Sequence, residues 1–315
     1  MRIVADFVIE HASLVATCAG PAPRRGAAQR DINAIRDASI AAHQGVVVYV
    51  GPASDAEQQL DLHDEAVRLD ARGCTVVPGF VDPHTHLVFA GDRQDELHRR
   101  LAGATYETIA AEGGGIKKTV ALTRAASAKE LADAARPRLD EMLAAGTTTC
   151  EVKSGYGLTT ESELAQLRAI RDLNRTHTVD IVPTFLGAHD IPAEFTSRRA
   201  DYVTCIVNEM IPRVAAEALA EWCDVFCDVG YFTPEESIAI LEAGKRAGLK
   251  PRIHADQLAT SGGCRAAAHV GARSADHLVH VDESEADALA SANVTAVLLP
   301  IAAFYLKLDR FAPAP

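Results

Sequence analysis

From about residue 75 the chain alternates short β-branched runs with segments of helical spacing, and this alternation restricts the fold more than any other feature. Seven such runs can be counted, over residues 74–82, 147–152, 179–187, 223–229, 250–255, 272–278 and 293–300. Strands that alternate with helices form parallel β–α units, and their sheet is buried on both faces. The pattern therefore predicts an α/β fold of the TIM-type (β/α)8 barrel class.

The segments between the strands carry signals for the start of helices. Ser127–Glu130 and Thr160–Glu163 have the spacing of a capping box, and Thr233–Glu236 has the same spacing with a proline at the first helical position. Asp282 is expected to open a further helix. These signals predict that helices cover the sheet between its strands.

The two ends of the chain depart from the barrel pattern. After Leu299 the chain runs through IAAFYLKLDRFAPAP, in which we expect neither a helix nor an eighth strand. We therefore expect strands 1–7 of a barrel over residues 76–315, with strand 8 missing and the chain truncated at its C-terminal side. Residues 1–75, with runs such as VVVYVGPAS, predict a small β-rich element that forms half of a sandwich.

Charge and composition limit the partners and the compartment. The net charge is −12, which argues against nucleic acid and anionic membranes as partners. No apolar run approaches the roughly 20 residues that a membrane helix needs. Seven cysteines without regular spacing indicate reduced thiols and a cytoplasmic location. Cys223 and Cys227 are expected to be buried thiols on a strand.

Histidines gather at the carboxyl ends of the predicted strands. His84 and His86 follow the first strand, and residues i and i+2 of an extended chain point to the same side. His189 follows the third strand, His254 the fifth and His277 the sixth. Barrel enzymes keep their active sites on this face. Three imidazoles, from His84, His86 and His254, suit zinc or iron, and the spacing does not choose between the two.

Two further features allow two interpretations each. Lys153 follows the second strand, where it is either a carbamylated bridge between two metal ions or an ordinary charged residue near the site. Gly113–Gly115 lacks the lysine pattern of a phosphate-binding loop. It is either a loop that folds over the site or a plain linker.

Several segments resemble, in this order, those of a known family. They are PGFVDPHTHLVFAGDR, YETIAAEGGGI, EVKSGYGL, TFLGAHDIP, HADQL, SADHL and VLLP. From about residue 70 to residue 307 the chain closely resembles the imidazolonepropionase family of the amidohydrolase superfamily. The HxH element is shared by the whole superfamily, whereas the combination of KSGYGL, FLGAH and HADQL is specific to the family.

The resemblance implies a metal-dependent barrel beside a small β-sandwich. Members of the family open the ring of 4-imidazolone-5-propanoate with water and give N-formimidoyl-L-glutamate, in histidine degradation. By position, His84, His86 and His254 resemble the ligands of one zinc or iron ion, and Lys153 is not a carbamate in this resemblance. The implied partner is a small-molecule substrate, and a homodimer is usual for such enzymes.

The same resemblance implies roles for the remaining polar residues. Arg93, Tyr156, His189 and Gln257 resemble the positions that contact the substrate. His277 resembles the histidine that orients the water or polarises the reacting carbonyl. We therefore expect His277 to be catalytic and the other four residues to bind substrate.

One departure from the family affects the expected activity. The family's fourth metal ligand is an aspartate after strand 8, which has no counterpart up to Pro315, and Asp309 lies before that place. We therefore expect a three-histidine site in a chain that is poorly stable or inactive by itself. The alternatives are another amidohydrolase, acting as a deaminase or on a different cyclic amide, and a non-catalytic fragment that binds metal.

Overall fold

The computed structural model describes residues 2–104, 108–109 and 112–313 and divides at Gly79 into two compact units. The first unit is Met1–Gly79 and the second is Phe80–Pro315. The predicted boundary after residue 75 lies just before this division. The segment 106–116, which contributes to the family resemblance, lies partly outside the described residues.

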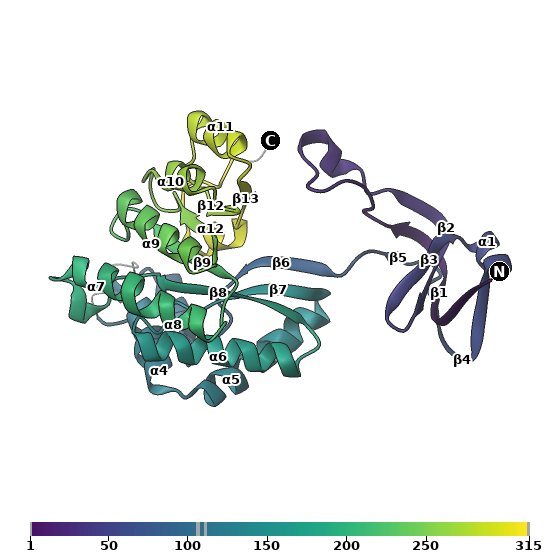
Figure 1. Ribbon diagram of the computed structural model, residues 1–315, viewed down its shortest axis with the longest axis horizontal. Helices are drawn as coiled ribbons and strands as arrows, with labels where there is room; N and C mark the ends of the chain where they lie inside the picture. The colour runs from purple at the N-terminus through teal and green to yellow at the C-terminus, as the bar shows by residue number, and fades with distance from the viewer. Residues whose placement is uncertain (1, 105–107, 110–111, 314–315) are drawn as a thin grey trace. The chain divides into compact units, whose positions relative to one another are not determined.

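The N-terminal unit is a small mixed sheet (Figure 1). Its strands are β1 (Ile3–Ala16), β2 (Ala34–His43), β3 (Val46–Pro52), β4 (Leu60–Asp70) and β5 (Thr75–Val76). The order is β3-β2-β1-β4, with β5 also on β1; β1 pairs antiparallel with β2 and parallel with β4. The helix α1 (Ala53–Gln59) contributes Ala56 to a small core with Val8 and Leu60.

The second unit contains the predicted parallel barrel. Its strands are β6 (Phe80–Thr85), β7 (Thr147–Lys153), β8 (Asp180–Ala188), β9 (Trp222–Cys227), β10 (Lys250–Pro251), β11 (Ile253–Ala255), β12 (Ser274–His277) and β13 (Thr295–Val297). They follow the order β6-β7-β8-β9-β11-β12-β13, with β10 on β9, and every pairing is parallel. The α/β barrel class and its seven strands are therefore confirmed.

The barrel has one open seam. Its edge strands are β6 and β13, and no pairing joins them within residues 2–104, 108–109 and 112–313. A parallel sheet that nearly closes in this way still directs the carboxyl ends of its strands to one face. Side chains from β6 and β12 can therefore meet inside the barrel although the strands are not neighbours.

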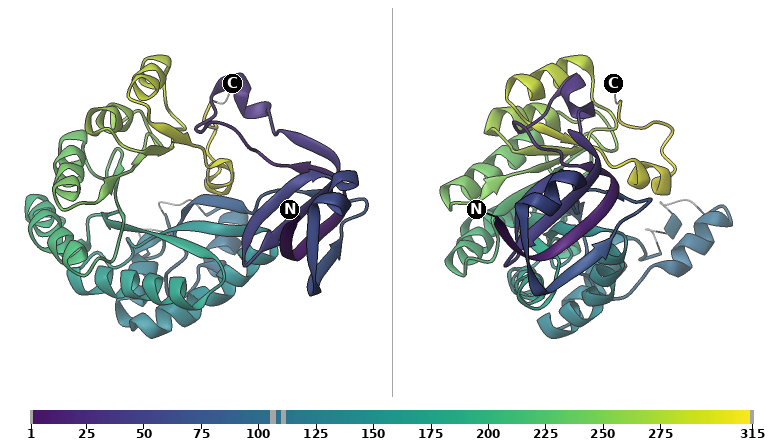
Figure 2. Two further views of the ribbon diagram at one scale, coloured as in Figure 1. Left: turned by 45° about the vertical axis from the view of Figure 1, so that its right-hand side comes forward. Right: turned by 90° about the vertical axis from the view of Figure 1, so that its right-hand side faces the viewer.

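Helices cover the outside of the strands (Figure 2). The described helices of this unit are α2 (Gln94–Leu101), α4 (Ile116–Ala125), α5 (Ala128–Ala144), α6 (Thr160–Thr176), α7 (Arg199–Cys205), α8 (Ile211–Ala216), α9 (Pro234–Arg246), α10 (Gly263–Val270), α11 (Glu283–Ser291) and α12 (Pro300–Leu306). Leu131 of α5 and Leu167 of α6 are fully buried in the layer between helices and sheet, with Val152 of β7. Across the described ranges, no helix combines the length and the apolar character that crossing a membrane requires.

The helix starts confirm three predictions and correct one. Ser127 and Thr233 form capping boxes, and Asp282 caps α11 in the same way. The predicted box at Thr160 is wrong, because Thr159 is the cap residue of α6 and its hydroxyl accepts from the N–H of Ser162. Either of the adjacent residues Thr159 and Thr160 could have been the cap residue. The carboxylate of Glu163 accepts hydrogen bonds from a neighbouring loop instead of from the cap residue.

The segment after Leu299 was also predicted incorrectly. It forms the helix α12, which begins at Pro300. Proline is favoured at the first helical position because its φ is already suitable and its missing N–H is not needed there. The short alanine-containing run that follows is compatible with a helix.

The cysteines agree with the prediction. All seven are free thiols, and Cys223 and Cys227 lie buried on β9. Burial raises the pKa of Cys227 to about 11, so this thiol stays protonated at neutral pH. Both residues are part of the barrel core.

Candidate active site

Three histidines converge at the carboxyl ends of the barrel strands. His84 lies near the end of β6, His86 follows the strand, and His254 lies on β11. The Nε2 atom of His86 is 3.3 Å from that of His84 and 3.2 Å from that of His254. One ring nitrogen from each residue lies within 4.8 Å of the others. The structure thus brings together the three residues that were predicted to bind metal.

Buried carboxylates hold the opposite side of two of these rings. Asp276 Oδ2, on β12, lies 2.6 Å from His84 Nδ1, and Asp224 Oδ1, on β9, lies 3.0 Å from His254 Nδ1. An ionised carboxylate only accepts hydrogen bonds, so each Nδ1 carries the proton and each Nε2 keeps a lone pair. Lone pairs that face one another repel unless a cation lies between them. Because imidazole nitrogens are ordinary ligands of zinc and iron, this donor set fits a metal ion.

Two cations partly neutralise the carboxylates beneath the histidines. Lys153 Nζ lies 2.7 Å from Asp224 Oδ2 and 2.8 Å from Glu151 Oε1. Arg252 Nη2 lies 2.9 Å from Asp276 Oδ2. All five side chains are buried, and a buried charge without a partner costs several kcal/mol. Three carboxylates against two cations leave one negative charge, which favours a further cation at the histidines. Lys153 therefore acts here as an ion-paired ammonium.

The electrostatics of the site keep the imidazoles of His84 and His86 neutral. Burial lowers the pKa of His84 well below its ordinary value, and the charge of Lys153 adds to this effect. Burial also lowers the pKa of His86 well below the ordinary value. For Asp224 burial acts in the raising direction, but His254 and Lys153 together hold its pKa well below the usual range. Neutral histidines beside ionised carboxylates are in the protonation state that metal binding requires.

His277 lies beside the three histidines in an unusual backbone conformation. It is the last residue of β12 and has φ +79°, and the next residue, Leu278, has φ +57°. Its ring centroid is 5.1 Å from that of His84 and 5.2 Å from that of His254. Side chains held at positive φ cost energy and cluster at functional sites. Burial, with His254 nearby, lowers the pKa of His277 to about 3, so its ring is neutral at pH 7.

Aromatic rings form one wall of the cluster. The ring of His189, which follows β8, stacks on that of His86 with centroids 4.9 Å apart. The ring of Tyr156 lies 5.7 Å from His86 and 5.3 Å from His189. His189 Nδ1 is 2.9 Å from the carbonyl oxygen of Gly155. Burial lowers the pKa of His189 to about 3, so this wall is neutral and polar.

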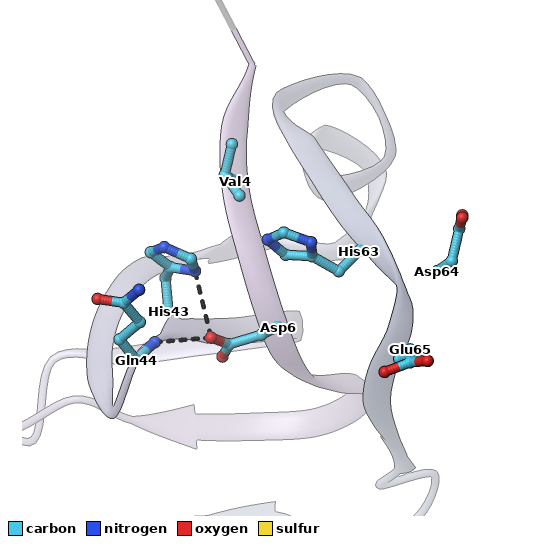
Figure 3. A pocket seen from close by; sticks show the side chains of 7 residues that line it. All are labelled: Val4, Asp6, His43, Gln44, His63, Asp64 and Glu65. Carbon is cyan, nitrogen blue, oxygen red and sulfur yellow. Dashed lines mark hydrogen bonds and ion pairs between the residues drawn. The ribbon is translucent and has the colours of Figure 1, made fainter.

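A separate polar hollow of about 920 Å³ lies in the N-terminal unit (Figure 3). It is lined by Val4, Asp6, His43, Gln44, His63, Asp64 and Glu65. Within it, Asp6 Oδ2 accepts from the Gln44 N–H at 2.8 Å and lies 3.2 Å from His43 Nδ1. It contains none of the predicted site residues. We therefore place the functional site at the histidines of the barrel.

Comparison with known proteins assigns the chain to a family. An imidazolonepropionase from Symbiobacterium thermophilum is 48% identical over 310 residues, which are 98% of this chain and 73% of the relative. One from Brevibacillus brevis is 49% identical over 304 residues, which are 96% of this chain and 72% of the relative. The chain belongs to the imidazolonepropionase family. No family model matches it.

Solved structures show the fold of this imidazolonepropionase-family chain at larger evolutionary distance. An adenosine deaminase from Xanthomonas campestris with bound zinc matches with a TM-score of 0.59 and 18% identity, over 99% of this chain and 66% of that one. A 5-methylcytosine deaminase from Klebsiella pneumoniae matches with a TM-score of 0.63 and 14% identity, over 97% and 68% of the two chains. At this level of identity the likeness shows the fold alone.

Two predicted substrate contacts lie less directly at the histidines. Arg93 precedes α2, and its Nε is 3.7 Å from Glu96 Oε2. Within the residues that the structure describes, no hydrogen bond, ion pair or ring contact joins Arg93 to the histidine cluster. Gln257 is half-buried three residues after His254, and its backbone N–H donates to Asp228 Oδ2 at 2.8 Å. Their roles remain predictions.

Sequence reasoning missed the residues that hold the histidines. It assigned no role to Glu151, Asp224, Arg252 or Asp276, although all four are buried beneath the site. One signal was available: an acid within an apolar strand, such as Asp224 in CDVFC, has to find a partner when the strand is buried. That partner could not be identified from the sequence, because the contacts join different strands.

Replacing Lys153 by methionine should destabilise the protein strongly. The change leaves Asp224 and Glu151 buried without their cation, and breaking a buried ion pair from one side costs about 3–5 kcal/mol. Urea-induced unfolding measures the loss in the free energy of unfolding. Lys129→Met is the matched control, because Lys129 pairs with Asp133 on the exposed face of α5 and should have little effect. Equal stabilities of the two variants would show that the buried network does not support the fold.

Proposed function

We propose that this chain hydrolyses 4-imidazolone-5-propanoate to N-formimidoyl-L-glutamate, as a step of histidine degradation, with one zinc or iron ion held by His84, His86 and His254. The observation that carries the proposal is the convergence of three Nε2 atoms, two of them with Nδ1 engaged by a carboxylate, in a chain of the imidazolonepropionase family. The substrate is a small planar ring with an amide-like C–N bond. That bond resists water at neutral pH.

The reaction requires a nucleophile, a proton acceptor and a proton donor. Oxygen from water adds to the ring carbonyl carbon, the C–N bond breaks, and the departing nitrogen receives a proton. The bound ion would lower the pKa of water to about 7 and polarise the carbonyl. The protein has to supply a base of suitable position and to hold the ring against the three histidines.

His277 is the residue of this chain best suited to move the proton. Its ring lies beside His84 and His254 and is neutral at pH 7. It can take the proton of the attacking water and later return it to the departing nitrogen. His277 has a positive φ at the end of β12, and its ring lies beside those of His84 and His254.

The remaining residues would bind the substrate. Tyr156 and His189 stand beside His86 and offer a ring surface with polar groups. Gln257 would add an amide donor and acceptor. Arg93 would pair its guanidinium with the propanoate carboxylate, in exchange for its long contact with Glu96.

Ring opening by the purified, metal-analysed chain tests the function, and His277→Gln tests the catalytic assignment. Loss of the substrate's ultraviolet absorbance without release of ammonia is expected, and ammonia release would identify a deaminase instead. His277→Gln should lower kcat by about 10²–10⁴-fold with metal content unchanged, since the proton-transfer group is lost. The control is His269→Gln, on the exposed side of α10. Metal binding without turnover in the parent chain would refute the proposed activity and agree with the inactive chain that the sequence predicts.

Asp224→Asn should weaken metal binding by about 10–100-fold, because the residue fixes the Nδ1–H tautomer of His254. Competition with a chromophoric chelator measures the affinity for zinc. Asp140→Asn is a matched control, because Asp140 also pairs with a histidine, His177, at 3.1 Å, but away from the cluster. If both variants bind zinc as tightly as the parent chain, Asp224 has no part in holding the ligand.

A further inference from the structure

A buried carboxylate on α6 binds the backbone of the loop 154–158. Glu163 Oε2 accepts from the N–H of Gly155 at 3.0 Å, and Oε1 accepts from those of Gly157 and Leu158 at 2.8 Å each. The side chain of Glu163 is completely buried. A carboxylate that accepts several backbone N–H groups makes strong, charge-assisted hydrogen bonds. The residue predicted to cap its own helix thus holds a neighbouring loop instead.

The loop needs this support because its backbone is unusual. Gly155 has φ +110° and Leu158 has φ +52°. A Cβ atom at Gly155 would lie 3.0 Å from the carbonyl oxygen of Leu186 and 3.1 Å from His189 Nδ1. Only glycine fits this conformation at so close an approach. Such a backbone persists only when its surroundings fix it from several sides.

A second residue of α6 joins the loop to the metal-binding segment. Gln166 Oε1 accepts from the N–H of Tyr156 at 3.1 Å, and its Nε2 donates to the carbonyl oxygen of Val88 at 2.7 Å. Gln166 is completely buried. Val88 lies two residues after His86. The amide therefore ties the position of the Tyr156 backbone to that of the HxH segment.

The loop in turn orients His189. The carbonyl oxygen of Gly155 accepts from His189 Nδ1–H at 2.9 Å, since a carbonyl oxygen cannot donate. Nε2 of His189 therefore keeps a lone pair, and its ring stacks on His86. A planar substrate with a ring N–H offers the matching donor. Gly155 thus connects Glu163, through its N–H, to His189, through its carbonyl oxygen.

We propose that Glu163 and Gln166 are positioning residues that hold the loop 154–158, so that Gly155 fixes His189 in the Nδ1–H tautomer and Tyr156 stands beside it. His189 Nε2 then selects substrates that present a ring N–H. The identity of that substrate rests on the proposed function, whereas the positioning does not. Neither residue touches the reacting atoms, so both act through the loop.

The test compares Glu163→Gln with Glu161→Gln in the full zinc-loaded chain. Glu161 lies on the same helix, and its side chain is 73% exposed and pairs with Arg213, so its change should have no effect. Glutamine at position 163 presents an NH2 group to backbone N–H donors and cannot satisfy all three. Amide hydrogen exchange at residues 155, 157 and 158 should become about tenfold faster or more. Nitrogen NMR of His189 should show loss of the single Nδ1–H tautomer.

Kinetics provide a third measurement. KM for the imidazolone substrate should rise about tenfold in Glu163→Gln, with a smaller change in kcat, because binding geometry is lost while the proton-transfer group remains. Zinc content should stay at the parent value. If the parent chain opens no ring, the proposed function fails, but the exchange rates and the His189 tautomer still decide the positioning role.

Two results would overturn the proposal. One is that the amide exchange rates of the loop and the tautomer of His189 are the same in Glu163→Gln as in Glu161→Gln. The other is faster exchange with an unchanged tautomer, which would mean that Glu163 only stabilises the loop. If Glu163→Gln does not fold, Gln166→Leu takes its place, because it removes the partners of Tyr156 and Val88 without placing a new polar group in the core. Gln166→Leu should also lose the single Nδ1–H tautomer of His189. An unchanged tautomer in this variant would refute the positioning role.

Discussion

The hydrogen bond between His84 and Asp276 spans the barrel interior, and much of the site depends on it. The two residues lie on β6 and β12, which are not neighbours in the sheet, yet Nδ1 and Oδ2 are 2.6 Å apart. Arg252 extends this link, because its Nη2 contacts both Asp276 Oδ2 and the carbonyl oxygen of Pro83. Side chains therefore connect the two sides of the barrel where β6 and β13 do not pair.

This hydrogen bond is stable only because buried cations pair with the carboxylates of the site. Asp276 and Asp224 would be costly in a dry interior without Arg252 and Lys153, and the cations would be equally costly alone. The pKa of Lys153 lies above its ordinary value because Asp224 and Glu151 outweigh the effect of burial, which acts in the lowering direction. Fold and function share these groups, since the same carboxylates that neutralise the cations also fix the tautomers of the histidines.

The sequence was sufficient for the strand-end residues and insufficient for their supports. Alternating strands and helices place all carboxyl strand ends on one face, so His84 and His254 could be brought together without coordinates. Asp224 looked like any residue of a strand, because its partner comes from another strand. Glu163 was misread for a different reason: a local capping pattern matched, but the loop 154–158 competed for its carboxylate. Local rules miss a residue whose partners are set by tertiary packing.

The histidines also differ in how firmly the protein holds them. Three have an Nδ1 partner: Asp276 for His84, Asp224 for His254 and the Gly155 carbonyl for His189. In the described ranges Nδ1 of His86 is buried and has none. Its ring stacks on that of His189, while its Nε2 faces the Nε2 atoms of His84 and His254. The orientation of His86 therefore depends most on the proposed ion, and the loop that fixes His189 is also the main protein support of this third ligand.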